Sequence, residues 1–82
     1  MYLYLGRETV IPAGDIIGIF DLENTSVSRF TKAFLKSAQR AGQVVAVSDG
    51  LPKSFIVCGR AGGRAVYLSQ ISPPTLKKRL GF

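Results

Sequence analysis

Residues 26–42 read SVSRFTKAFLKSAQRAG, and they contain the strongest helical pattern in the chain. Ser26 is a suitable N-cap and Gly42 a suitable C′ residue, so a helix is expected over residues 27–41. One face of this helix, about 80° wide on a helical wheel, is apolar. It consists of Val27, Phe30, Phe34, Ala38 and Ala41. This face is expected to pack against the rest of the protein.

The opposite face of the same helix carries only positive charge. It consists of Arg29, Lys32, Lys36 and Arg40, and residues 27–41 include no acidic residue. Solvated helices usually mix signs, because Glu–Lys pairs four residues apart stabilise a helix and like charges destabilise it. A stripe of four cations without a counter-charge therefore indicates a surface for a polyanion.

The rest of the chain has the patterns of short strands and turns. Residues 2–5 and 9–11 predict a hairpin, and residues 16–20 predict a strand that is apolar, and so covered, on both faces. Beyond the helix, residues 43–48, 54–58 and 64–69 predict three strands joined by compact turns, which is a meander. The sequence Ser72-Pro73-Pro74 is typical of a helix start, and a short helix is expected over residues 75–80.

These elements define the expected fold class, which is α+β. A small, mostly antiparallel β-sheet, built from a hairpin plus a meander, should accompany one long amphipathic helix and a short C-terminal helix. The length of 82 residues predicts a single domain, residues 1–82. About six strands present two faces for one long helix to cover, and 46% of the residues are hydrophobic. We therefore expect apolar surface to be buried between copies, in a homo-oligomer.

Charge is distributed unevenly along the chain. The net charge is +6, but residues 1–23 sum to −3 and residues 24–82 sum to +9. Such a polycation suggests a polyanionic partner, nucleic acid above all, although charge also keeps a hydrophobic chain in solution. No signal-peptide pattern is present, and no apolar run approaches the roughly 20 residues that span a bilayer. With one unpaired cysteine, Cys58, the sequence predicts a cytoplasmic protein without a membrane partner.

Catalytic chemistry is not expected. The chain has no histidine, and Cys58 ends an apolar strand without a base beside it, which favours a buried structural thiol over a nucleophile. Glycine-rich residues 59–64 join two strands rather than a strand and a helix, which favours a hairpin turn over a phosphate-binding loop. Asp15, Asp21 and Glu23 could form a carboxylate cluster, but the last two fit a turn before a helix. We expect no enzyme, no metal site and no cofactor.

Three groups of cations are candidate residues for binding double-stranded DNA. The helix stripe is the most specific, because a face of one sign is improbable by chance. A second group lies in the predicted turns and consists of Lys53, Arg60 and Arg64. A weaker third group, near a helix C-terminus where cations are stabilising anyway, consists of Lys77, Lys78 and Arg79. Phosphate contacts should dominate such binding, and RNA binding through the same cations is a more distant alternative.

Four segments of the chain together resemble a known family. They are LG and VIP within residues 5–12, DIIGIFD at residues 15–21, GLPKS at residues 50–54 and SPPTLKKR at residues 72–79. In combination they resemble the RemA/RemB family of bacterial extracellular-matrix regulators, and the RemB branch more closely, over nearly the whole chain. The resemblance implies a small β-sheet with a packed helix. It also implies a cytoplasmic, DNA-binding regulator of biofilm-matrix genes that forms a ring and contacts DNA around its rim.

The same resemblance shows where this chain departs from the RemA branch. Basic residues that are important for DNA in that branch match Asp15 and Leu51-Pro52 here, and in that loop only Lys53 keeps a positive charge. The resemblance therefore implies that DNA binding rests on the helix stripe, Lys53 and the arginines of the glycine-rich hairpin. The leading prediction is an oligomeric, ring-forming transcriptional regulator. The alternative is a ring-forming assembly or adaptor protein, working alone or with a RemA-like partner, that does not itself bind DNA.

Overall fold

The computed structural model of the chain describes residues 1–23, 28–60 and 63–81, and these residues form six strands, two α-helices and one short 3₁₀ turn. The elements are β1 (Tyr2–Gly6), β2 (Thr9–Pro12), η1 (Ala13–Asp15), β3 (Ile16–Asp21), α1 (Arg29–Arg40), β4 (Val44–Ala46), β5 (Ser54–Arg60), β6 (Gly63–Ser69) and α2 (Pro73–Arg79). The α+β class expected from the sequence is confirmed. Neither described helix has the length and apolar character needed to cross a bilayer.

Strands β1 and β2 form the expected antiparallel hairpin as a two-stranded sheet of their own. Leu3, Leu5 and Ile11 point inward and are almost completely buried, while the residues that alternate with them point outward. The turn between the strands begins at Gly6, whose φ of +123° is accessible to glycine without strain. The hairpin therefore presents one apolar face to the rest of the protein and the other to solvent.

The remaining strands form a four-stranded sheet in the order β3-β5-β6-β4. Strand β5 is antiparallel to both of its neighbours, whereas β4 pairs in parallel with β6. The expected meander is therefore wrong in its strand order, because β4 does not pair with the strand that follows it. Residues 54–58 are all buried, which suits β5 to the centre of the sheet, and the exposed Val45 suits β4 to an edge.

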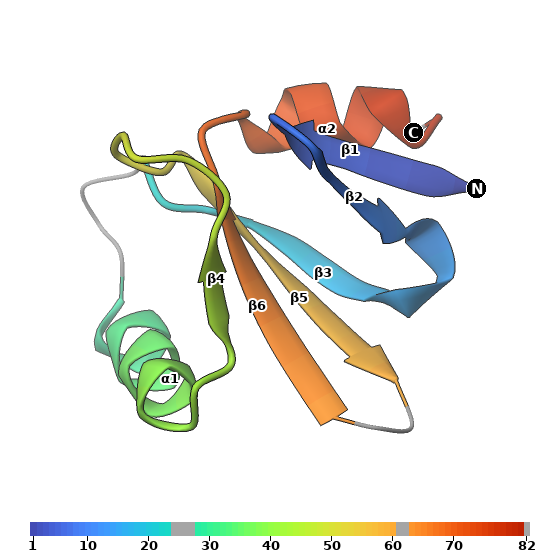
Figure 1. Ribbon diagram of the computed structural model, residues 1–82. Coiled ribbons are helices and arrows are strands. Elements are labelled where there is room, and N and C mark those ends of the chain that lie inside the picture. The colour runs from blue at the N-terminus through green and yellow to red at the C-terminus, as the bar shows by residue number, and fades with distance from the viewer. Residues whose placement is uncertain (24–27, 61–62, 82) are drawn as a thin grey trace.

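Strand β3 lies at the other edge of this sheet, and only one of its faces is covered. Ile16 and Ile19 pack into the core on the hairpin side, while Ile17 and Phe20 are exposed on the other side. The expectation that residues 16–20 are covered on both faces is therefore wrong. The reason is the place of α1, which lies beside β4 at the opposite edge of the sheet (Figure 1).

Two hydrophobic clusters lie on the two faces of the four-stranded sheet. On one face the hairpin and α2 contribute Leu3, Leu5, Ile11 and Leu76, which pack with Ile56 and Cys58 of β5. On the other face Ala38 of α1 packs with Phe55, Val57 and Val66. The hairpin and α2 occupy one corner of the molecule in Figure 1, and α1 occupies the opposite corner. The protein therefore has two separate outer surfaces, one formed by the hairpin and α2 and the other formed by α1.

Helix α1 begins later than the sequence predicted. Its N-cap is Ser28, whose Oγ accepts a hydrogen bond from the backbone N–H of Thr31 at 3.1 Å. Ser26 is therefore not the N-cap, and both Ser26 and Val27 lie outside the described residues. At the other end Gly42 has a φ of +71°, so its predicted role as the C′ residue is confirmed.

The buried side of α1 is also turned relative to the prediction. Ala38 is buried and Phe34 and Leu35 are half-buried against the sheet, whereas Phe30 and Ala41 are exposed. The expected burial of Phe30 and Ala41 is therefore wrong. Leu35, which the wheel had left out of the apolar face, packs instead, because the buried side is centred near Ala38.

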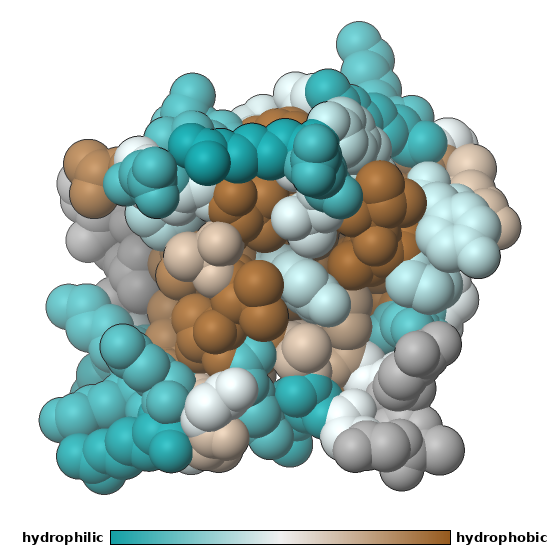
Figure 2. Space-filling view, in the orientation of Figure 1, coloured by the Kyte–Doolittle hydropathy of each residue, from teal (hydrophilic) through white to brown (hydrophobic). Residues whose placement is uncertain are grey.

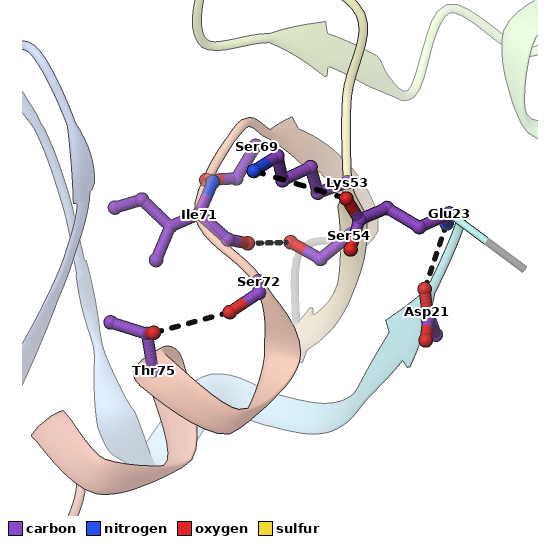
Figure 3. A network of polar contacts seen from close by, with 8 residues as sticks. All are labelled: Asp21, Glu23, Lys53, Ser54, Ser69, Ile71, Ser72 and Thr75. Atoms are coloured by element: carbon purple, nitrogen blue, oxygen red, sulfur yellow. Dashed lines mark hydrogen bonds and ion pairs between the residues drawn. The ribbon is translucent and has the colours of Figure 1, made fainter.

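Helix α2 begins at Pro73, with Ser72 as its N-cap as predicted. Two fully buried serines connect the start of this helix to the sheet. Ser54 Oγ donates to the carbonyl of Ile71 at 2.8 Å, and the backbone N–H of Ile71 donates to Ser69 Oγ at 3.1 Å (Figure 3). Ser69 Oγ in turn donates to the carbonyl of Leu5 at 2.8 Å. These bonds join β1, the sheet and α2 into one unit.

Candidate nucleic-acid interface

The four cations of α1 lie together on the outer face of the helix, as predicted. Arg29, Lys32, Lys36 and Arg40 are all exposed. The ion pairs between described residues are Arg7–Asp49 and Lys53–Glu23, so none of the four has an acidic partner there. Hydrophilic atoms cover the corner of the surface where α1 lies (Figure 2). The stripe is therefore a continuous cationic surface without an internal counter-charge.

One member of the stripe also contacts an aromatic ring. The guanidinium carbon of Arg29 lies 5.6 Å from the centroid of the Phe30 ring. A cation over an aromatic face is attracted by the negative potential of the ring, which at exposed sites is worth about 0.5–1 kcal/mol. This contact holds Arg29 toward the Phe30 side of the helix and leaves Lys32, Lys36 and Arg40 facing solvent.

Lys53 lies in the loop between β4 and β5, and its charge is already paired. Its Nζ lies 3.8 Å from Oε1 of Glu23, and both side chains are about half exposed (Figure 3). The backbone of Lys53 is also fixed, since its N–H donates to the carbonyl of Ser69 and its carbonyl accepts from Leu22. The loop is therefore well positioned, but its one lysine is partly neutralised.

The glycine-rich hairpin carries two arginines, and the structure describes the side chain of one of them, Arg64. Strands β5 and β6 pair up to Arg60 and Gly63, which confirms the hairpin expected at residues 59–64. Arg64 is exposed, and its guanidinium carbon lies 5.7 Å from the centroid of the Phe34 ring. The side chain of Arg60 and residues 61–62 lie outside the described part of the chain. Arg64 therefore faces the α1 side of the sheet.

The basic run of α2 belongs to a different surface. Lys77, Lys78 and Arg79 are exposed in the last turn, and Arg79 Nη1 donates to the carbonyl of Tyr4 at 3.1 Å. Figure 1 places α2 beside the hairpin, at the corner opposite α1. The predicted cations are thus not gathered into one patch: Arg29, Lys32, Lys36, Arg40 and Arg64 lie on the α1 side, and the α2 run does not.

The groups considered for catalysis are placed as ordinary structural residues. Cys58 is 6% exposed, and burial, reinforced by the negative charge of Asp15, raises its pKa to about 11. Such a thiol stays protonated at neutral pH and is a poor nucleophile. Asp21 accepts a hydrogen bond from the backbone N–H of Glu23 at 2.7 Å, which fixes the turn after β3. The described residues hold no cluster of three His, Cys, Asp or Glu side chains that could bind a metal ion.

An exposed apolar groove between α1 and β3 was missed by the sequence analysis. It measures about 490 Å³ and is lined by side chains that include Ile17, Phe20, Phe30, Phe34 and Arg64. Phe30 is 76% exposed, although the helical wheel had placed it in the core. The signal that could have revealed it is Leu35, an apolar residue about 140° around the helix from Phe30. A buried side that includes Leu35, Phe34 and Ala38 leaves Phe30 at its border. We call this surface the α1–β3 groove.

The comparison with known proteins agrees with the motifs found in the sequence. A family model described as RemA-like, extracellular matrix regulatory protein A-like, matches residues 3–80. The chain belongs to this family. It is also 38% identical over 82 residues to extracellular matrix regulatory protein B of Bacillus subtilis (strain 168), covering 100% of this chain and 93% of that protein. The predicted membership in the RemA/RemB family, closer to RemB, is confirmed.

The structure describes the two places where the resemblance implies a difference between this RemA-like chain and the RemA branch. Asp15 is half-buried at the end of η1, directly before β3. Leu51 is 90% exposed in the loop that also carries Lys53. Where the resemblance implies basic residues in the RemA branch, this chain therefore has a half-buried acid and an exposed apolar side chain. The helix stripe is the largest group of exposed cations without an ion pair among the described residues.

Proposed function

We propose that this RemA-like chain is an oligomeric DNA-binding regulator of extracellular-matrix (biofilm) genes, and that α1 is the surface that contacts DNA. The observation that carries the proposal is the one-signed outer face of α1, whose four exposed cations have no acidic partner among the described residues. The match to a family of matrix regulatory proteins supports the regulatory role.

Competing contacts of the loop cations favour the helix stripe as the DNA surface in this proposal. Phosphate binding by Lys53 competes with its ion pair to Glu23, and the carboxylate of Glu23 also repels a phosphate. Arg64 lies over the ring of Phe34, and this contact would also be lost. Lys32, Lys36 and Arg40 have no ion pair to break within the described chain. The stripe extends over the twelve residues of α1, roughly 16 Å, which is long enough to meet several phosphates.

Binding of this kind has a distinct dependence on salt. Each phosphate neutralised by a lysine or arginine releases counterions and contributes about −0.9 to the slope of log K against log salt concentration. Contacts to phosphates carry little sequence information. The affinity for duplex DNA should therefore fall steeply with salt and vary little with sequence. Several stripes in one oligomer should make the slope steeper than one copy could.

Three double charge reversals with the same change in net charge test the surface directly. They are Lys32→Glu with Lys36→Glu, Lys53→Glu with Arg60→Glu, and Lys77→Glu with Lys78→Glu. Affinity for a long labelled duplex would be measured by fluorescence anisotropy at two salt concentrations. The helix pair should abolish binding, while the other two pairs should keep most of it. If the loop pair abolishes binding and the helix pair does not, α1 is not the DNA surface.

A ring-forming adaptor is the second candidate function. The loop that bears Leu51 and Pro52 offers one cation, Lys53, and that cation is paired with Glu23. A chain whose loops no longer bind DNA could still assemble, alone or with a RemA-like partner. An oligomeric wild-type protein that binds no duplex even at low salt would support the adaptor and exclude the DNA-binding regulator.

A further inference from the structure

Two apolar surfaces of this chain are left uncovered by the residues that the structure describes. The first is the α1–β3 groove, at which Phe30 and Ile17 are 76% and 69% exposed. The second is the outward face of the β1–β2 hairpin, which consists of Tyr2, Tyr4 and Val10. Tyr4 and Val10 are partners across the hairpin, and Tyr2 is 70% exposed. Contiguous apolar patches of this kind are uncommon on monomers and mark interaction sites.

The α1–β3 groove is poorly suited to pair with itself. Arg64 lines it and Arg29 lies over the ring of Phe30 at its border, while no acidic residue lines it among the described residues. A two-fold contact through the groove would bring together the same arginines from both copies. Like charges desolvated at one interface oppose each other. The occupant must therefore present a different surface, one without positive charge.

The hairpin face has the complementary chemistry. Strands β1 and β2 carry no charged residue of their own, and their outer face offers two tyrosine rings and a valine. The guanidinium of Arg79 reaches β1 from α2, where it is engaged by the carbonyl of Tyr4. At the hairpin tip Glu8 is negative, and the positive charge of Arg7 is paired with Asp49 at 3.3 Å. Aromatic faces attract guanidinium groups, which is what the border of the groove provides. One surface therefore supplies cations with an apolar floor, and the other supplies aromatic rings.

We propose that the hairpin face of one copy of this chain binds in the α1–β3 groove of the next copy, head to tail. This inference rests on the proposed oligomeric function and assigns the surfaces that build the oligomer. The hairpin and α1 lie at opposite corners of the molecule (Figure 1), so each copy can bind one neighbour through each surface. A repeated head-to-tail contact closes into a ring when its rotation allows.

The contact leaves the proposed DNA surface accessible. Phe30 and Lys36 are six residues apart, which places them about 120° apart around the helix axis. The groove uses the Phe30 side of α1, and Lys32, Lys36 and Arg40 lie on the outer side. One helix can therefore serve the assembly with one flank and a polyanion with another.

Two single variants and a matched control test the assignment by light scattering coupled to size-exclusion chromatography. Phe30→Asp alters the groove, Tyr2→Asp alters the hairpin face, and Leu51→Asp makes the same change at an exposed apolar residue outside both surfaces. The first two should lose the wild-type mass and elute as 8.8 kDa monomers with the wild-type circular dichroism, and the control should keep the wild-type mass. A Phe30→Asp variant that keeps the wild-type mass overturns the inference while leaving the proposed function standing.

Mixing the two variants tests the head-to-tail arrangement itself. The Tyr2→Asp copy keeps an intact groove and the Phe30→Asp copy keeps an intact hairpin face. Together they should form a 1:1 pair of twice the 8.8 kDa mass and grow no further, because the two remaining surfaces are both altered. Two variants that stay monomeric when mixed contradict the arrangement. A wild-type protein that is itself monomeric would overturn the oligomeric function together with this inference.

Discussion

The Cys58 thiol shows how burial makes a potentially nucleophilic group inert. It ends the buried part of β5, and the loss of solvation, with the nearby charge of Asp15, raises its pKa from 9.0 to about 11. Well below pH 9 the thiol is protonated in both the folded and the unfolded chain. Between pH 9 and 11 the unfolded chain releases this proton and the folded chain keeps it, so stability should fall.

Urea unfolding at pH 8 and pH 10.5 measures this effect. Lysines and tyrosines titrate in the same range, so the comparison requires Cys58→Ala as the control variant. The wild type should lose more stability than the control over this interval. Equal losses would show that Cys58 does not titrate differently in the folded protein.

Ser69 is a buried polar residue whose hydroxyl serves two backbone groups at once. It donates to the carbonyl of Leu5 and accepts from the N–H of Ile71. Replacement by alanine leaves both groups buried without that partner, which should destabilise the protein by about 1–3 kcal/mol. Ser37→Ala, at an exposed helical position, should be close to neutral in the same denaturant titration. A neutral Ser69→Ala would mean that water replaces the hydroxyl.

At the scale of single elements, the end of α1 depends on one glycine. Gly42 adopts a φ of +71°, and a Cβ there would meet no atom within 4 Å, so any cost of substitution is in the backbone. Gly42→Ala should therefore lower the free energy of unfolding, measured by thermal denaturation, by about 1–2 kcal/mol. Gly42→Asn should lower it less. Gly14→Ala, also in open space but without a positive φ, is the matched control. Equal effects of the two alanines would contradict this account.

The same helix shows what the sequence could and could not predict for one element. Its cationic face was predicted correctly, because a small rotation of a helix about its axis leaves a broad charged face in solvent. The burial of Phe30 was wrong, because a wheel gives the pattern of apolar residues but not the direction of the sheet. Leu35, at the border of the pattern, packs against the sheet in place of Phe30. The groove could not be predicted for the same reason.

At the scale of the whole molecule, the limits of prediction lie in strand order. Hairpins are local, so β1–β2 and β5–β6 follow from the apolar runs and the turns between them. The parallel pairing of β4 with β6 is not local, and no turn pattern specifies it. It leaves β3 at an edge beyond the reach of α1. The exposed Ile17 and Phe20 are therefore consequences of topology rather than of local sequence.

Assembly and DNA binding should be coupled through the number of stripes that act together. An oligomer that presents several α1 helices to one duplex binds with an effective concentration that a single copy lacks, which can raise affinity by about 10²–10⁴-fold. Phe30→Asp leaves Lys32, Lys36 and Arg40 unchanged but should prevent assembly. Its affinity for a long duplex should therefore fall by about 10²-fold or more, and its salt slope should become shallower. Leu51→Asp, with the same added charge and an intact groove, should bind nearly as the wild type does.

On a duplex too short to reach a second copy, the wild type and both variants should bind alike. Equal affinity of Phe30→Asp and Leu51→Asp for the long duplex would show that the stripe of one copy is sufficient, and that the oligomer serves a purpose other than binding DNA.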